Sequence, residues 1–233
     1  MKYYVYISDT KIEMFYSQLA NSDGQESESS LGVDLKVFKA EVKKSRKTPN
    51  TKYTKLEAIL KELEDSDLIG EVGSNKSYIK GDLEMTWASF GDLDSPITFW
   101  GYLSEELALG LAGSRHHVLG AQPQNVASSR SDTNAIATWF LQQLGDVPPK
   151  DQSEARELFR TYHGSLSDKD VTDYTFCAVY DIRGPKNRFE FIAKVLHRGK
   201  FIYESELSDE NGESEPSYEN NVVLATPLYV AMK

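Results

Sequence analysis

Cysteine is almost absent from this chain of 233 residues. Its single thiol, Cys177, cannot form an internal disulfide, so the sequence excludes a disulfide-rich secreted scaffold and a zinc site with several thiolate ligands. Cys177 lies in the apolar run 174–180, where we expect a buried and unreactive side chain.

Long apolar runs are also missing. No stretch approaches the roughly 20 apolar residues that a helix needs to span a bilayer. Residues 1–6 lack the charged region, apolar region and cleavage site of a signal peptide. We therefore expect a cytoplasmic protein with no membrane partner.

The common motifs of nucleotide-binding loops are absent as well. The chain has no Gly-x-x-x-x-Gly-Lys-Ser/Thr loop and no Gly-x-Gly-x-x-Gly after a strand, and no Gly-x-Ser-x-Gly motif surrounds Ser114. The sequence thus gives no reason to expect a cofactor or a metal. It leaves open whether the protein is an enzyme, and the balance favours a binding protein.

The net charge is −10, with 26 basic and 36 acidic residues, which argues against nucleic acid as a partner of the whole molecule. Segments 21–30 and 204–219 hold three and seven acidic residues and no basic one. The net charge therefore belongs to two predicted loops, and the rest of the chain is balanced.

Apolar spacing predicts an α+β fold. Helices are indicated by the apolar stripes within 12–19, 53–63, 136–144 and 155–162; strands are indicated at 2–8, 33–42, 78–90, 97–103, 107–120, 174–182, 189–198, 201–206 and 222–232. We expect Asp9 or Thr10 to cap the first helix, Thr54 to cap the second, and Gly199 to turn a hairpin. Because strands follow one another in runs, we predict a mainly antiparallel curved sheet or partly open barrel with about four helices. We expect a single domain over 1–233, with 145–150 as the candidate boundary.

The segment 107–120 is the most unusual one. If it is extended, its odd positions carry leucines, whereas its even positions begin with Ala108, Gly110 and Ala112. A face of such small residues allows a close approach, by a packed helix or sheet or by a ligand. The alternative is a hairpin that turns at 113–114.

Four residues of this segment are our candidates for a ligand site: Ser114, Arg115, His116 and His117. A guanidinium binds phosphate or carboxylate, and an imidazole titrates near neutral pH. Adjacent strand residues point to opposite faces, so an extended chain would keep the two imidazoles out of one pocket. The other histidines, His163 and His197, are expected at a helix end and in a turn, exposed to solvent.

A basic strip is the other candidate for anion binding. Between residues 36 and 55 the chain has eight basic residues and one acid, and the patch includes Lys36, Lys39, Lys43, Lys44, Arg46 and Lys47. The alternative interpretation is an edge strand whose lysines prevent pairing with another chain.

The leading functional hypothesis is a binding or interaction module for an unknown ligand, a small anionic molecule or a protein partner, near 107–120. The alternatives are a hydrolase or nuclease that uses His116 or His117 with Arg115, and nucleic-acid binding through the strip 36–55. The sequence does not specify the oligomeric state.

Three segments resemble an uncharacterised bacterial family of domain-of-unknown-function type: YYVYISDTKI at 3–12, GLAGSRHHVLG at 110–120 and TPLYVA at 226–231. The resemblance covers nearly the whole chain. It implies a bacterial cytosolic protein with one family-length domain, and it implies no known activity.

Overall fold

A computed structural model describes residues 2–21, 51–89, 97–120, 167–181, 184–203 and 218–233. Its elements are β1 (Tyr3–Ile7), α1 (Asp9–Asn21), α3 (Lys52–Asp65), β2 (Ile69–Glu71), β3 (Tyr78–Ser89), β4 (Ile97–Leu103), β5 (Leu107–Ser114), the 3₁₀ turn η1 (Arg115–His117), α6 (Asp168–Asp181), β6 (Lys186–Tyr203) and β7 (Tyr218–Met232). The predicted strand 33–42, the helices at 136–144 and 155–162, the candidate boundary 145–150 and both acidic loops lie outside the described residues, apart from the loop ends at Asn21 and 218–219.

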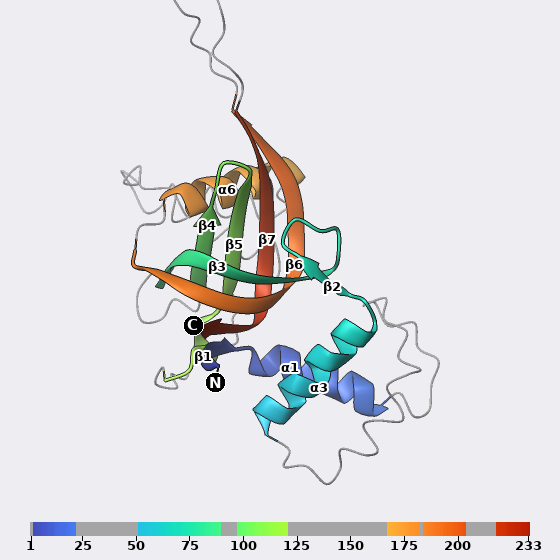
Figure 1. Cartoon of the computed structure of the whole chain (residues 1–233). Coiled ribbons are helices and arrows are strands. Elements are labelled where there is room, and N and C mark those ends of the chain that lie inside the picture. Colours follow the sequence, from blue (N-terminus) through green and yellow to red (C-terminus); the bar gives the residue numbers. More distant parts are fainter. Residues whose placement is uncertain (1, 22–50, 90–96, 121–166, 182–183, 204–217) are drawn as a thin grey trace, which may run out of the picture.

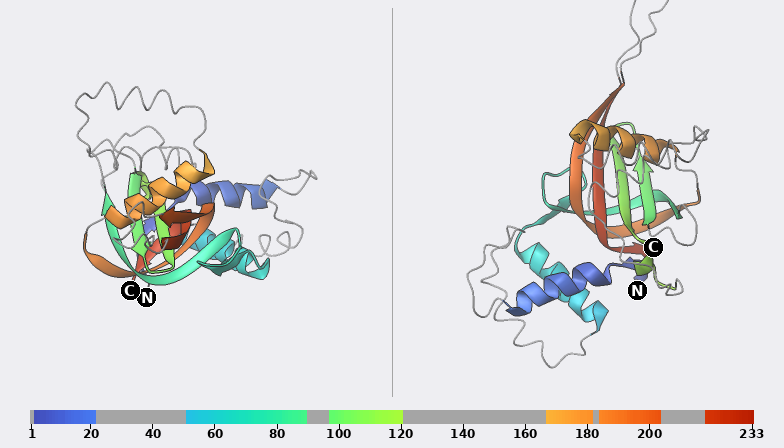
Figure 2. Two further views of the ribbon diagram at one scale, coloured as in Figure 1. Left: turned by 90° about the horizontal axis from the view of Figure 1, so that it is seen from above. Right: turned by 180° about the vertical axis from the view of Figure 1, so that it is seen from behind.

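The seven strands form one sheet in the order β1-β7-β5-β4-β3-β2, and β6 pairs with both β3 and β7. The pairings therefore lead from β3 through β4, β5, β7 and β6 back to β3, and the sheet curves into a ring-like arrangement (Figures 1 and 2). Two pairs are parallel, β2 with β3 and β5 with β7, and the others are antiparallel. The predicted α+β class with a curved, mainly antiparallel sheet is confirmed.

The helices lie at two separate places on the sheet (Figure 1). Helix α6 packs its apolar side on the small residues Ala108 and Ala112 of β5. Helices α1 and α3 pack together at the other end of the sheet, where Ile12 and Ile59 join a buried cluster with residues of β6 and β7. The small-residue face of β5 thus receives a packed helix. None of the helices in the described part of the chain is long and apolar enough to cross a membrane.

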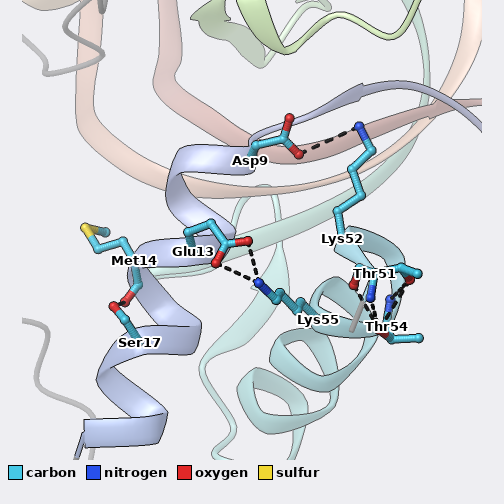
Figure 3. Close-up of polar contacts among 8 residues, drawn as sticks. All are labelled: Asp9, Glu13, Met14, Ser17, Thr51, Lys52, Thr54 and Lys55. Carbon is cyan, nitrogen blue, oxygen red and sulfur yellow. Dashed lines mark hydrogen bonds and ion pairs between the residues drawn. The ribbon is translucent and has the colours of Figure 1, made fainter. Parts of the chain in front are cut away.

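Ion pairs join α1 and α3 at their exposed side (Figure 3). The Lys55 ammonium donates to both carboxylate oxygens of Glu13 at 2.6 and 2.7 Å, and Lys52 Nζ lies 3.7 Å from Asp9 Oδ1. Helix α3 begins one turn earlier than expected, because Thr51 is its N-cap and the Thr54 hydroxyl closes the capping box.

The prediction of a strand at 174–182 was wrong, since residues 174–181 belong to α6. Its aromatic and β-branched residues favour a strand, but the buried positions recur at helical spacing, as at Val171, Thr175 and Val179. A capping box stabilises the start of the helix: Asp170 N donates to Ser167 Oγ, and Ser167 N donates to Asp170 Oδ2. Cys177 is half-buried on this helix, not fully buried.

The predicted hairpin at Gly199 was also wrong. Strand β6 continues through this position and pairs with β7 on both sides of it. A side chain at Gly199 would overlap the Thr172 hydroxyl of α6. The glycine therefore allows a helix to approach the strand, and it does not make a turn.

Tyr6 of β1 makes a second close approach, to Gly113 of β5. Its ring is fully buried and meets the rings of Trp100 and His117 edge to face. A Cβ on Gly113 would overlap the Tyr6 hydroxyl and would lie 2.7 Å from Cζ. Only glycine leaves room for the tyrosine at this point.

We expect Gly113→Ala to lower the free energy of unfolding by about 1–3 kcal/mol, because the buried tyrosine must move away from the new methyl group. Gly73→Ala is the matched control. A Cβ at Gly73 would have no atom within 4 Å, and the backbone φ of Gly73 is not positive, so alanine fits there without strain. Urea denaturation at pH 7 measures both. Equal stability of the two variants would contradict the close packing of Tyr6.

Candidate functional site

Strand β5 ends at Ser114, and the chain then enters the 3₁₀ turn η1. The Ser114 hydroxyl caps this turn by accepting a hydrogen bond from His116 N at 3.3 Å. The segment 107–120 is therefore neither one extended strand nor a hairpin turning at 113–114. Because the chain turns here, the two side chains do not point to opposite faces of a strand. The rings of His116 and His117 lie side by side, with their centroids 5.6 Å apart.

The four candidate residues differ in exposure. Ser114 and His117 are buried, Arg115 is half-buried and His116 is exposed. In the part of the chain that the structure describes, no carboxylate pairs with the Arg115 guanidinium. The patch residues Lys36 to Lys47 lie outside the described residues, whereas Lys52 and Lys55 of the same strip pair with acids of α1.

The start of α1 lies directly against His117. Thr10 Oγ1 is 3.2 Å from His117 Nε2, and Asp9 Oδ2 is 4.0 Å from His117 Nδ1. Sequence reasoning placed Asp9 and Thr10 only as helix caps and missed their place in the site. The two segments are separated by 107 residues, so no local pattern could have joined them.

The neighbouring strands hold these two segments together. The Ser8 amide, immediately before α1, donates to the Leu228 carbonyl of β7 at 2.9 Å. After η1, Leu119 N donates to the Val5 carbonyl of β1 at 2.9 Å. The beginning of α1 and the end of η1 are therefore both attached to β1 and its partner strand.

The pKa of His117 is lowered to about 4, mainly by burial; the positive charges of Lys11 and Lys52 act in the same direction, while Asp9 acts in the opposite one. The imidazole is thus neutral at pH 7. Its Nδ1 is buried and makes no hydrogen bond within the described residues.

Lys11 is a half-buried titratable group beside this turn. Its ammonium donates to Thr226 Oγ1 at 2.7 Å and, at 3.4 Å each, to Ser8 Oγ and the Pro227 carbonyl. Burial, with a smaller effect of Lys194, lowers the pKa of Lys11 to about 8. Three oxygens match its three donors, so Lys11 fixes the first turn of α1 on β7.

His197 differs from its prediction as an exposed turn residue. It lies in β6 with a side chain only 9% exposed, and its Nε2 is 2.7 Å from the Thr172 hydroxyl of α6. His163 lies outside the described residues. Within the described ranges, no three His, Cys, Asp or Glu side chains gather as metal ligands would.

The low pKa of His117 predicts a loss of stability in acid. Between pH 6.5 and about 4 the unfolded chain binds a proton that the folded imidazole resists, so unfolding becomes easier as the pH falls. We expect this residue to contribute a loss on the order of 3 kcal/mol across that window.

Urea unfolding at pH 7, 5.5 and 4 would measure the effect. The pH dependence should be weaker in His117→Gln and unchanged in His116→Gln, the exposed neighbour. If His117→Gln lost stability in acid as steeply as the unchanged chain, the buried neutral imidazole would not be its cause.

Comparison with known proteins identifies a family for this chain. No curated protein and no solved structure matches the chain. A family model described as a family of unknown function, DUF7019, matches residues 2–233. That range includes β1, η1 and β7 and so every residue that meets at the start of α1. The chain belongs to this family of unknown function, DUF7019.

Proposed function

We propose that the protein is a binding module for a small anionic molecule, which it holds between η1 and the first turn of α1. The contact of Thr10 with His117 carries the proposal, because it brings the amino-terminal end of a helix to the Arg-His-His turn. The sequence selects Arg115 by its chemistry, and the contact of α1 with the same turn supports the proposal.

The local charge supports an anionic ligand. Lys11 is close enough to His117 to lower the pKa of His117, and Arg115 precedes His117 in the same turn. Asp9 is the one acid among the charged groups that act on His117. A positive region of this kind in a chain of net charge −10 favours a negative partner.

The backbone of α1 supports the same conclusion. The first amide that donates within the helix is that of Ile12, to the Ser8 carbonyl at 3.0 Å. The amides of residues 9–11 precede it, and none of them has an acceptor among the described residues. Free amides at a helix start attract anions, and the buried, unpartnered Nδ1 of His117 adds a further polar group beside them.

A thermal-shift screen with nucleotides and sugar phosphates tests the proposal. We expect at least one of these anions to raise the melting temperature. In Arg115→Ala the Kd for that compound should rise about 10- to 100-fold, the effect of losing one charge-assisted hydrogen bond.

Lys80→Ala is the matched control, because it removes one exposed positive charge on β3, away from η1. It should bind as the unchanged chain does. Two results would reject the proposal: no anion of the panel stabilises the protein, or Arg115→Ala binds it as tightly as Lys80→Ala.

A protein partner bearing a carboxylate or phosphate at the same turn is the alternative form of this proposal. Nucleic-acid binding through 36–55 has less support, since Lys52 and Lys55 already pair with Asp9 and Glu13. A cytoplasmic location and a single domain over 1–233 are part of the same proposal, and the apolar patterning supports the single domain.

A further inference from the structure

We infer that Thr10 is a nucleophile for acyl transfer, activated by His117 with Asp9 as the orienting carboxylate. The inference rests on the proposed function only for the negative charge of the substrate, which Arg115 would bind. It is drawn from a comparison of two clusters in this chain, each made of a histidine, a threonine and an aspartate.

Both clusters place a histidine at the first turn of a helix. At α1, His117 Nε2 lies 3.2 Å from the Thr10 hydroxyl and Nδ1 lies 4.0 Å from the Asp9 carboxylate. At α6, His197 Nε2 lies 2.7 Å from Thr172 Oγ1 and Nδ1 lies 4.0 Å from Asp168. Each aspartate is the first residue of its helix.

One hydrogen bond distinguishes the two clusters. The Thr172 hydroxyl donates its hydrogen to the Asp168 carbonyl at 2.9 Å, so it must accept from His197, whose Nε2 then carries the proton. Such a nitrogen cannot accept a proton from the hydroxyl. In addition, Thr172 is only 3% exposed, which keeps a substrate away from it. The α6 cluster is therefore a structural contact.

The α1 cluster lacks both restrictions. Within the described residues, His117 is the one hydrogen-bond partner of the Thr10 hydroxyl, which leaves its hydrogen available to Nε2. The ring proton is then on Nδ1, toward the Asp9 carboxylate. Thr10 is exposed, and His117 is buried and neutral at pH 7. This is the hydroxyl, base and orienting carboxylate of nucleophilic acyl transfer.

The 4.0 Å gap between Asp9 and Nδ1 is longer than a hydrogen bond. Catalytic hydrogen bonds are often long in a protein without substrate and shorten in the complex. A proton arriving on Nε2 makes the ring cationic, a form that burial disfavours. The Asp9 carboxylate, which raises the pKa of His117, offsets this cost as it is drawn toward Nδ1.

The substrate class is a carboxylic ester that carries a negative group for Arg115. Thr10 Oγ adds to the ester carbonyl carbon while its proton passes to His117 Nε2. The oxyanion is stabilised by the free amides of residues 9–11. The C–O bond to the leaving group breaks, and the alcohol leaves with the proton from His117. Water then attacks the acylated Thr10, again through His117, and releases the carboxylic acid with the threonine restored.

The full chain treated with p-nitrophenyl acetate tests this inference. We expect a burst of p-nitrophenolate and an acetyl group on Thr10, which fragment mass spectrometry separates from one on Lys11. Thr10→Val should lower the burst rate by roughly 100-fold or more, and Thr10→Ser should restore it. Thr172→Val, the matched control from the α6 cluster, should react as the unchanged chain does.

Acetylation of Lys11 instead of Thr10, the absence of a burst, or an unchanged rate in Thr10→Val would overturn the inference. Circular dichroism of each variant verifies that it is folded. The probe is neutral and independent of Arg115, so the two proposals fail separately. Anion binding that needs Arg115, without an acetylated Thr10, leaves the binding function and removes the nucleophile. The reverse result removes anion binding alone.

Discussion

A strand has two edges for hydrogen bonding, and both edges of β7 carry partner strands. One edge pairs with β6 from Tyr218 to Met232. The other is divided, so that residues 221–225 pair with β5 in parallel and residues 229–232 pair with β1. Between these two partners lies Pro227, which has no amide to donate. The free oxygens at this point are taken by Lys11, which anchors the start of α1 to the sheet.

The division of this edge produces the candidate site. Because β1 pairs with β7 at residues 229–232, β5 pairs with β7 only up to residue 225, and the ring of Tyr6 lies against Gly113. The chain then turns at Ser114 instead of continuing as a strand, and the turn carries His117 to the first residues of α1. The contact between imidazole and helix thus follows from strand pairing and needs no motif in the sequence.

Much of the fold could be predicted from the sequence, because apolar spacing reports burial: β3, β4 and the first two helices follow from it. The strand prediction at 174–182 failed because its β-branched and aromatic residues suit either structure, and the capping box that begins the helix lies at Ser167, before this segment. The role of Gly199 was missed for another reason. The sequence does not distinguish a glycine that lets a helix pack closely on a strand from a glycine that forms a turn. The site was half predictable, since Arg115 to His117 are chemically distinctive, whereas Thr10 becomes relevant only through a contact across 107 residues.

The three segments that carry the resemblance to the family are 3–12, 110–120 and 226–231, and in space they meet at the start of α1. The first supplies Thr10 and Lys11, the second His117, and the third the oxygens that hold Lys11. Packing alone does not account for this arrangement, because Thr10 is exposed and contributes no burial. The cluster at α6 shows that the same residue types can serve structure when the hydroxyl is buried and its hydrogen is bound by a carbonyl. At α1 the hydroxyl is exposed and has no hydrogen-bond partner other than His117 among the described residues, so the two clusters differ both in burial and in that hydrogen bond.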